Sequence, residues 1–187
     1  MPPPSVCFRC LRPTLAAQTC SVCFAQTGVS AVWRVCVYVG AGKELIWRLK
    51  FTGAQSAAAL IAGCFINLYK PAPEALIVPL PTATGRVRQR GYDQAALVAR
   101  AYANMSNCRY APCLARSGQQ HQRGNNRAIR LKQLDGAYRV RRGINVRGAS
   151  ILLVDDVATT GASLQAAAQT LLAAGAAKVE AIVFAQA

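Results

Sequence analysis

Apolar residues follow two distinct patterns along this chain. Short, nearly continuous apolar runs predict strands buried in a sheet, and they occupy residues 76–81, 151–154 and 179–184. Apolar residues recur at helical spacing in segments that precede and separate these runs, at residues 43–51, 55–69, 94–105 and 162–174. Weaker signals predict a strand or hairpin at 29–39, short strands at 112–116 and 136–140, and a helix at 125–134.

Strands that alternate with helices predict an α/β fold, in which a parallel sheet is flanked by helices on both faces. In such sheets, ligands bind beyond the carboxyl ends of the strands, where the strand order reverses. The segments that follow Leu80 and Val154 are both expected at that edge. A chain of 187 residues has room for one medium domain and a small appendage. We expect the division to fall between residues 1–28 and 29–187.

The apolar content supports a packed core and argues against a membrane span. Hydrophobic residues make up 53% of the chain. The longest apolar stretch, 57–69, contains Asn67 and is too short to cross a bilayer as a helix. No charged segment leads into an apolar run near the first residue, so no secretory signal is predicted. We therefore expect a cytoplasmic protein without membrane insertion.

Positive charge is concentrated in one part of the sequence. The chain carries 22 basic and seven acidic residues, for a net charge of +15. Residues 86–147 hold 13 Arg and one Lys against two Asp, a net charge of +12. Arginine forks suit phosphate oxygens, so this stretch indicates a polyanionic partner, either a pyrophosphate substrate or nucleic acid. A basic surface with no dedicated partner is the alternative. Aromatic residues rarely lie among the arginines, so the sequence shows no stacking platform for bases.

Two Cys-x-x-Cys pairs near the N-terminus form a pattern typical of tetrahedral zinc sites. They comprise Cys7, Cys10, Cys20 and Cys23. Disulfides are disfavoured because no export signal is predicted. Four thiolates leave no open coordination position, so Zn2+ would be structural and would stabilise a segment too short to build its own core. The remaining cysteines lack this spacing and are expected to be small buried side chains: Cys36, Cys64, Cys108 and Cys113.

Residues 151–163 carry the most specific signal. The apolar strand is followed by Asp155 and Asp156, and then by a small-residue loop that opens a helix: Thr159, Thr160, Gly161, Ala162 and Ser163. Backbone N–H groups in such a loop converge on a phosphate together with the positive end of the helix. The carboxylates repel phosphate, so they must face hydroxyl groups or a metal. This combination matches a ribose 5-phosphate, and we interpret it as a site for phosphoribosyl pyrophosphate (PRPP). A helix cap would explain one aspartate but not two.

Residues 82–89 are predicted to form a loop after the strand at 76–81. Three arginines in or beside this loop are candidates for binding the pyrophosphate: Arg86, Arg88 and Arg90. A solvated loop is the alternative. In an enzyme, the reaction would be displacement of pyrophosphate at the anomeric carbon. Asp155 and Asp156 would then bind the ribose hydroxyls, directly or through Mg2+. His121, the single histidine, is expected to be a loop residue rather than a catalytic base.

Taken together, these motifs resemble the ComF/GntX family of phosphoribosyltransferase-like proteins over nearly the whole chain. The four cysteines resemble that family's zinc finger, and residues 45–53 its basic Leu-Lys-aromatic-x-Gly segment. Residues 78–94 are similar to its proline strand and Arg-Gly-aromatic-Asn-Gln signature, with Asp93 in place of Asn. Gln119 or Gln120, Arg130 and 136–138 resemble its Gln…Arg…Gly-Ala-Phe stretch, although Gln133 stands where Asn is expected.

The resemblance implies a type I phosphoribosyltransferase-like fold and a role in DNA uptake during natural transformation. It therefore implies single-stranded DNA and a protein of the competence machinery as partners. Transferases for 6-oxopurines carry an acidic residue where this chain has Thr159, which argues against hypoxanthine or guanine as acceptor. Two functions remain open. Either the chain binds and uses PRPP, or it binds single-stranded nucleic acid and its PRPP site is regulatory or vestigial.

Overall fold

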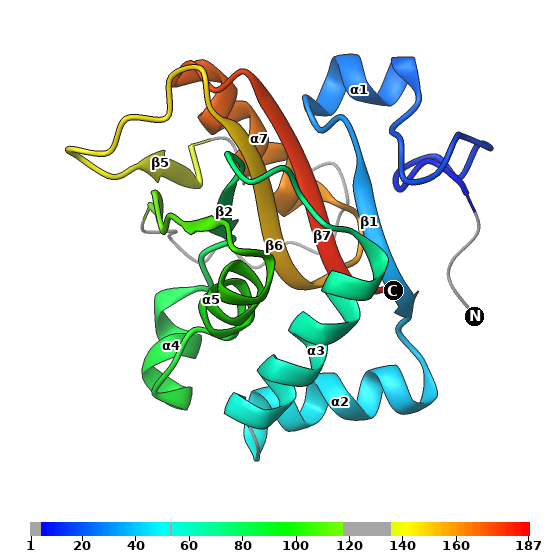
Figure 1. Cartoon of the computed structure of the whole chain (residues 1–187), viewed down its shortest axis with the longest axis vertical. Coiled ribbons are helices and arrows are strands. Elements are labelled where there is room, and N and C mark those ends of the chain that lie inside the picture. The colour runs from blue at the N-terminus through cyan, green and yellow to red at the C-terminus, as the bar shows by residue number, and fades with distance from the viewer. Residues whose placement is uncertain (1–4, 53, 118–135) are drawn as a thin grey trace.

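The computed structural model describes residues 5–52, 54–117 and 136–187. Its centre is a five-stranded parallel sheet with the strand order β1-β7-β6-β2-β3 (Figure 1). These strands are β1 (Val32–Val37), β2 (Leu76–Pro79), β3 (Arg109–Tyr110), β6 (Ser150–Ala158) and β7 (Lys178–Gln186). A separate antiparallel pair is formed by β4 (Leu114–Arg116) and β5 (Tyr138–Val140).

Helices cover both faces of the sheet (Figure 1). On one face lie α2 (Gly40–Phe51), α3 (Ala54–Leu68) and α5 (Gln94–Ser106), whose buried side chains include Ile46, Phe65 and Tyr102. The opposite face is covered by α7 (Ala162–Ala173), through Leu164 and Leu171. Two short helices, α1 (Ser21–Thr27) and α4 (Thr84–Arg90), complete the described part. The predicted α/β architecture is therefore confirmed.

The strand order reverses between β2 and β6, which are direct neighbours. The chain runs outward from β2 to β3 on one side and from β6 to β7 on the other. Pro79 lies opposite Val154, and the Leu80 N–H donates to the carbonyl oxygen of Val154 at 2.9 Å. Because β2 and β6 are parallel, the segments that follow the two strands leave the sheet at the same edge, where open α/β sheets bind ligands.

Two local predictions were wrong at this edge. The segment 82–89, expected to be a loop, forms most of α4. None of the α4 residues is buried, so the segment carries no apolar stripe that a periodicity search could detect. The strand predicted at 151–154 continues to Ala158, so Asp155 and Asp156 lie within β6. Backbone pairing with β7, which extends to Ala158 opposite Gln186, decides this length.

Other outcomes are mixed. The structure adds β3 and α1, which the sequence did not predict, and the helix predicted at 125–134 lies outside the described residues. Of the four cysteines expected to be buried, Cys113 is buried, whereas the other three are partly exposed: Cys36, Cys64 and Cys108. None of the helices in the described part combines the length and apolar character that crossing a bilayer requires. The division at residue 28 stays a prediction.

Candidate functional site

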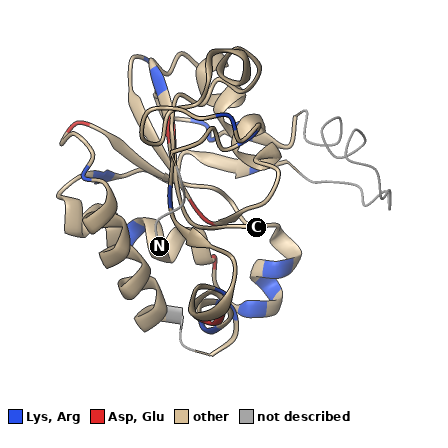
Figure 2. Ribbon diagram, turned by 90° about the vertical axis from the view of Figure 1, so that its right-hand side faces the viewer, with Lys and Arg blue, Asp and Glu red and all other residues tan. Residues whose placement is uncertain are grey.

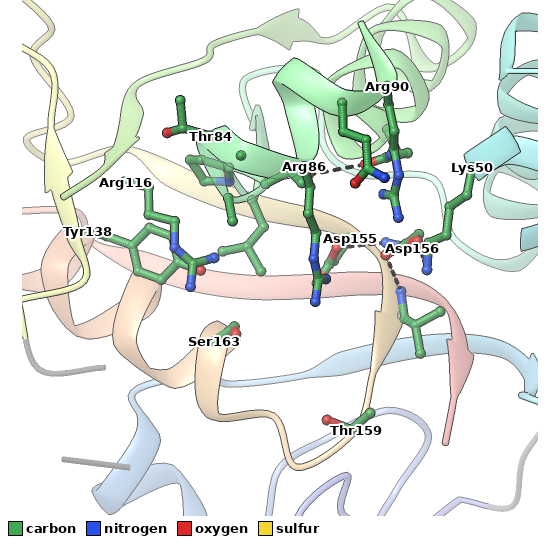
Figure 3. Close-up of a pocket in the computed structure, with 18 of the residues that line it drawn as sticks. Lys50, Thr84, Arg86, Arg90, Arg116, Tyr138, Asp155, Asp156, Thr159 and Ser163 are labelled. Carbon is green, nitrogen blue, oxygen red and sulfur yellow. Dashed lines mark hydrogen bonds and ion pairs between the residues drawn. The ribbon is translucent and has the colours of Figure 1, made fainter. Parts of the chain in front are cut away.

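A cleft of about 940 Å³ opens at the carboxyl edge of β2 and β6 (Figure 3). One wall comes from the segment after β2, including Thr84, Arg86 and Arg90 of α4. Another comes from the end of β6 and the start of α7: Asp155, Asp156, Thr159 and Ser163. The cleft therefore joins the two segments that the sequence placed at one edge, and it does so at the point where the strand order reverses.

Asp155 and Asp156 are the acidic residues in the lining of this cleft. Each accepts a hydrogen bond at 2.9 Å through Oδ1: Asp155 from the N–H of Asp156, and Asp156 from the N–H of Val157. The Lys50 Nζ atom lies 2.9 Å from Asp156 Oδ2. Burial raises the pKa of Asp155 well above its usual value, and the neighbouring Asp156 carboxylate raises it further, whereas Lys50 opposes the rise.

Only two of the three predicted arginines reach the cleft. Arg86 and Arg90 line it, and in Figure 3 the Arg86 side chain extends from α4 toward Asp155. Arg88 is exposed and is not among the lining residues. The reason is helical geometry. Arg86 and Arg90 are four residues apart and share a face of α4, whereas Arg88 is two residues from each and points away from that face. In a loop all three could have converged.

The loop predicted to bind phosphate turns sharply into α7. Gly161 has a φ of +73°, a left-handed conformation that suits glycine, and it is the N-cap of α7. The Ala162 N–H donates to Thr160 Oγ1 at 3.4 Å. Thr159 and Ser163 line the cleft, whereas Thr160, Gly161 and Ala162 are not in its lining. The N–H groups of the first turn of α7 nevertheless begin beside the cleft, and they have no acceptor within the helix.

The structure adds residues that sequence reasoning missed. Lys50 comes from the last turn of α2, Tyr38 follows β1, and Arg116 and Tyr138 come from the β4–β5 pair. The Arg116 guanidinium lies 5.7 Å from the centre of the Tyr138 ring, and both stand on the side of the cleft near Ser163 (Figure 3). Burial raises the pKa of Tyr138 and Arg116 opposes it, so this hydroxyl stays neutral at physiological pH. Three of these lay in stretches that the sequence analysis singled out, Lys50 in 45–53, Arg116 in 86–147 and Tyr138 in 136–138, but nothing in the sequence placed them at the cleft.

The side of α2 next to the cleft carries exposed aromatic and basic side chains. The rings of Trp47 and Phe51 have centroids 5.7 Å apart, and the Arg90 guanidinium lies 5.3 Å from the centre of the Phe51 ring. Trp47 is 49% exposed and Phe51 is 58% exposed. The structure thus assembles a surface of aromatic and basic side chains that the sequence did not reveal, because Phe51 and Arg90 are far apart in the chain. Basic residues recur along the ribbon in Figure 2, whereas acidic residues are sparse.

The four N-terminal cysteines come together as their spacing predicts. All four Sγ atoms lie within 4.8 Å of one another, and those of Cys10 and Cys20 are 3.6 Å apart. A tetrahedral Zn–S₄ centre with bonds of about 2.3 Å needs sulfur atoms roughly 3.8 Å apart, so the cluster could hold such a metal ion. Burial raises the pKa of Cys7, but hydrogen bonds from backbone N–H groups, beginning with that of Cys10, outweigh it and lower the pKa to about 6. Burial, with hydrogen bonds from the other three cysteines, raises the pKa of Cys23 to about 12, so within the cluster the thiolate is favoured at Cys7.

Several predicted positions fall outside the described residues, among them Gln119, Gln120, His121, Arg130 and Gln133.

Comparison with known proteins gives a family model and several relatives. The model of the phosphoribosyl transferase domain matches residues 94–187. The competence protein ComFC of Bacillus subtilis is 27% identical over 199 residues, which cover 93% of this chain and 80% of the relative. The DNA utilization proteins YhgH of Salmonella typhi and Salmonella typhimurium are each 29% identical over 148 residues, covering 73% of this chain and 63% of theirs.

Among solved structures, a hypoxanthine phosphoribosyltransferase from Trypanosoma cruzi is 16% identical, with a TM-score of 0.36. The likeness covers 76% of this chain and 65% of the other. A score this low carries no argument about substrate. The family match includes β6, the loop 159–163 and α7, whereas the arginines of α4 precede it.

Proposed function

This chain belongs to the phosphoribosyl transferase domain family, and its relatives support the resemblance to ComF proteins; on that premise we propose that it binds PRPP with Mg2+ in the cleft between β2 and β6. The observation that carries the proposal is the meeting of three chemical groups at one edge of the sheet. These are the carboxylate pair of β6, the loop that opens α7, and the arginines of α4.

Each group suits a different part of the ligand. N–H groups at the start of α7, with Thr159 and Ser163, would bind the 5-phosphate. Asp155 and Asp156 would bind the ribose hydroxyls and hold Mg2+, for which carboxylate oxygens are the preferred protein ligands. Arg86 and Arg90 would bind the pyrophosphate, because their guanidinium groups are always charged and form forked hydrogen bonds. Mg2+ would neutralise part of the pyrophosphate charge.

Turnover would follow from the same arrangement. A nucleophilic acceptor forms a bond to the anomeric carbon and loses a proton, while the bond from that carbon to pyrophosphate breaks and the leaving group keeps the electron pair. The positive charge that develops on the ribose ring would face the carboxylates, and the negative charge on the leaving oxygen would face Arg86 and Arg90. The residues of this chain would thus stabilise both ends of the breaking bond.

Calorimetric titration of PRPP with Mg2+ into the zinc-loaded protein tests the proposal. We expect saturable binding that is lost in Asp155→Asn/Asp156→Asn and kept in Glu74→Gln, which removes an exposed carboxylate elsewhere. A second comparison uses α4 itself. Arg86→Ala should weaken binding by about tenfold or more, since a hydrogen bond to a charged group contributes about 1.5–3 kcal/mol, whereas Arg88→Ala should not. Binding that survives in the double aspartate variant would contradict the assignment.

A second function, binding of single-stranded nucleic acid, is favoured by the surface that Trp47, Phe51 and Arg90 form beside the cleft. Successive bases stack on exposed aromatic rings while nearby basic side chains bind the phosphates. Lys43 on the same helix and Arg90 of α4 supply that charge. Relatives described as a competence protein and as DNA utilization proteins agree with this function. The PRPP site would then be regulatory or vestigial.

Fluorescence anisotropy of a labelled single-stranded oligonucleotide tests the second function. Trp47→Ala and Phe51→Ala should each weaken binding about 5- to 150-fold, as expected for the loss of one base–aromatic stack. Met105→Ala is a suitable control, because it removes an exposed apolar side chain from the end of α5. Affinity should fall steeply with salt concentration. Equal affinities in all three variants would exclude this surface.

A further inference from the structure

Phe8 connects the cysteine cluster to the loop of the PRPP site. It follows Cys7 directly and is 5% exposed. A Cβ atom placed on Gly161 would overlap Phe8 Cε2 and lie 2.9 Å from Phe8 Cδ2. Real Cβ atoms do not approach other atoms so closely, so the phenyl ring touches the backbone of the loop that opens α7. The edge of this ring occupies the space that any side chain at position 161 would need.

The segment that carries Phe8 is also anchored to the strands beneath it. The Gln186 side chain at the end of β7 donates from Nε2 to the Phe8 carbonyl oxygen at 3.0 Å. Arg34 of β1, which is 6% exposed, donates to the Val6 carbonyl oxygen at 2.6 Å. The backbone on both sides of Cys7 is therefore fixed to the sheet. This gives the Phe8 ring a defined position against the loop that opens α7.

We propose that Phe8 is a positioning residue for the phosphate loop, so that occupation of the four-cysteine site and binding of a ribose phosphate are thermodynamically coupled. This inference rests on the proposed PRPP site. It assigns the cysteine module a role beyond stabilising its own segment, because the state of the metal site would set the affinity of a cleft whose lining contains none of the cysteines.

The coupling has a physical basis in the loop. Residues 159–163 are small, and Gly161 adopts a left-handed conformation, so the backbone has many accessible alternatives. The Phe8 ring removes some of them by filling the space against Gly161. The segment around Phe8 is too short to form its own core, and a metal bound by the four cysteines would add to the hydrogen bonds from Arg34 and Gln186 that hold it. If the ring is lost or displaced, the loop adopts its binding conformation in a smaller fraction of molecules. The apparent affinity for the ribose phosphate then falls in proportion to that fraction.

The first test compares two phenylalanines that follow cysteines of the cluster. Phe8→Ala should weaken binding of Mg2+-PRPP at least about fivefold, the lower end of the range for coupled sites, while zinc content stays unchanged. Phe24→Ala removes the same ring beside Cys23, but Phe24 is 47% exposed and should leave PRPP affinity unchanged. Phe8→Leu, which refills part of the space, should recover part of the affinity. Equal PRPP affinity in Phe8→Ala and wild type would overturn the inference.

The second test needs no variant, because coupling is reciprocal. Zinc affinity, measured by equilibrium competition with a chromogenic chelator, should rise at least about fivefold when Mg2+-PRPP is present, and Phe8→Ala should abolish this increase. An unchanged zinc affinity in the wild-type protein would overturn the inference even if Phe8→Ala fails to fold. Wild-type protein that does not bind PRPP would instead refute the proposed function on which the inference depends, so the two failures are distinguishable.

Discussion

Replacing Lys50 by methionine tests whether the ion pair with Asp156 holds the carboxylates of β6 in place. Methionine keeps most of the side-chain volume and removes the charge. The Nζ atom lies 2.9 Å from Asp156 Oδ2, and the two side chains are 23% and 15% exposed. Lys43→Met is the matched control, because Lys43 is an exposed lysine on the same helix.

The expected magnitude follows from the distance and the partial burial. Two unit charges 2.9 Å apart attract by about 6 kcal/mol at an effective dielectric constant near 20. Desolvation of both groups offsets much of this attraction. Exposed pairs contribute about 0.2–1 kcal/mol and breaking a buried pair costs about 3–5 kcal/mol, so we expect this intermediate case to lose about 1–3 kcal/mol of unfolding free energy.

The loss should depend on pH. Burial and Asp156 already raise the pKa of Asp155, and Lys50 opposes the rise, so removal of Lys50 should raise that pKa further. An acid with a raised folded-state pKa binds its proton more tightly in the folded protein, and stability therefore falls as the pH rises toward that pKa. In Lys50→Met this fall in stability should continue to higher pH. The difference in unfolding free energy between wild type and Lys50→Met should therefore be small in acid and should grow as the pH increases.

Urea unfolding followed by tryptophan fluorescence measures the effect, because Trp33 stacks on Tyr69 with ring centroids 4.1 Å apart and its environment should change on unfolding. Wild type, Lys50→Met and Lys43→Met would be compared at about pH 5 and about pH 8, in zinc-containing buffer. We expect Lys43→Met to match wild type at both values. Equal unfolding free energies for Lys50→Met and Lys43→Met at the higher pH would refute the reasoning.

Three further predictions concern the scaffold. Leu171→Ala should cost about 2–5 kcal/mol of unfolding free energy, since Leu171 is fully buried against the sheet; a loss below about 1 kcal/mol in urea titration would contradict this. Asp93→Ala should cost about 1–3 kcal/mol, because Asp93 caps α5 through the Ala96 N–H and also accepts from the Thr82 N–H at 3.0 Å. Asp93→Asn keeps an acceptor and should lose less, and equal losses would count against the cap. Cys10→Ser should reduce bound zinc, measured by atomic absorption, whereas Cys36→Ser should not; normal zinc content in Cys10→Ser would exclude Cys10 as a ligand.

The sequence by itself determined the local features of this protein. The cysteine spacing predicted a cluster, and the structure brings the four sulfur atoms together. Alternation of strands and helices predicted the parallel sheet, and the strand, carboxylates and small-residue loop of 151–163 predicted where a ligand would bind. These features can be predicted because each depends on residues close together in the chain, where periodicity and spacing indicate the geometry directly.

Helix and strand boundaries at the cleft were less predictable. The α4 helix carries no apolar stripe, so its sequence looks like a loop, and only its helical geometry separates Arg86 and Arg90 from Arg88. β6 continues past its apolar residues because β7 pairs with its backbone as far as Ala158. In both places the deciding interaction is a backbone conformation or pairing that side-chain hydrophobicity does not encode.

Only the tertiary structure decided which distant residues meet. Lys50 reaches Asp156, Arg90 lies over Phe51, and Phe8 packs against Gly161, although each pair is separated by dozens of residues or more. Such contacts depend on strand order and on how the helices lie across the sheet. Periodicity tells which face of an element is buried, but not which partner buries it. That choice is made by the packing of the whole chain, and it places Phe8 of the cysteine segment against the loop that opens α7 and the aromatic surface of α2 next to the cleft.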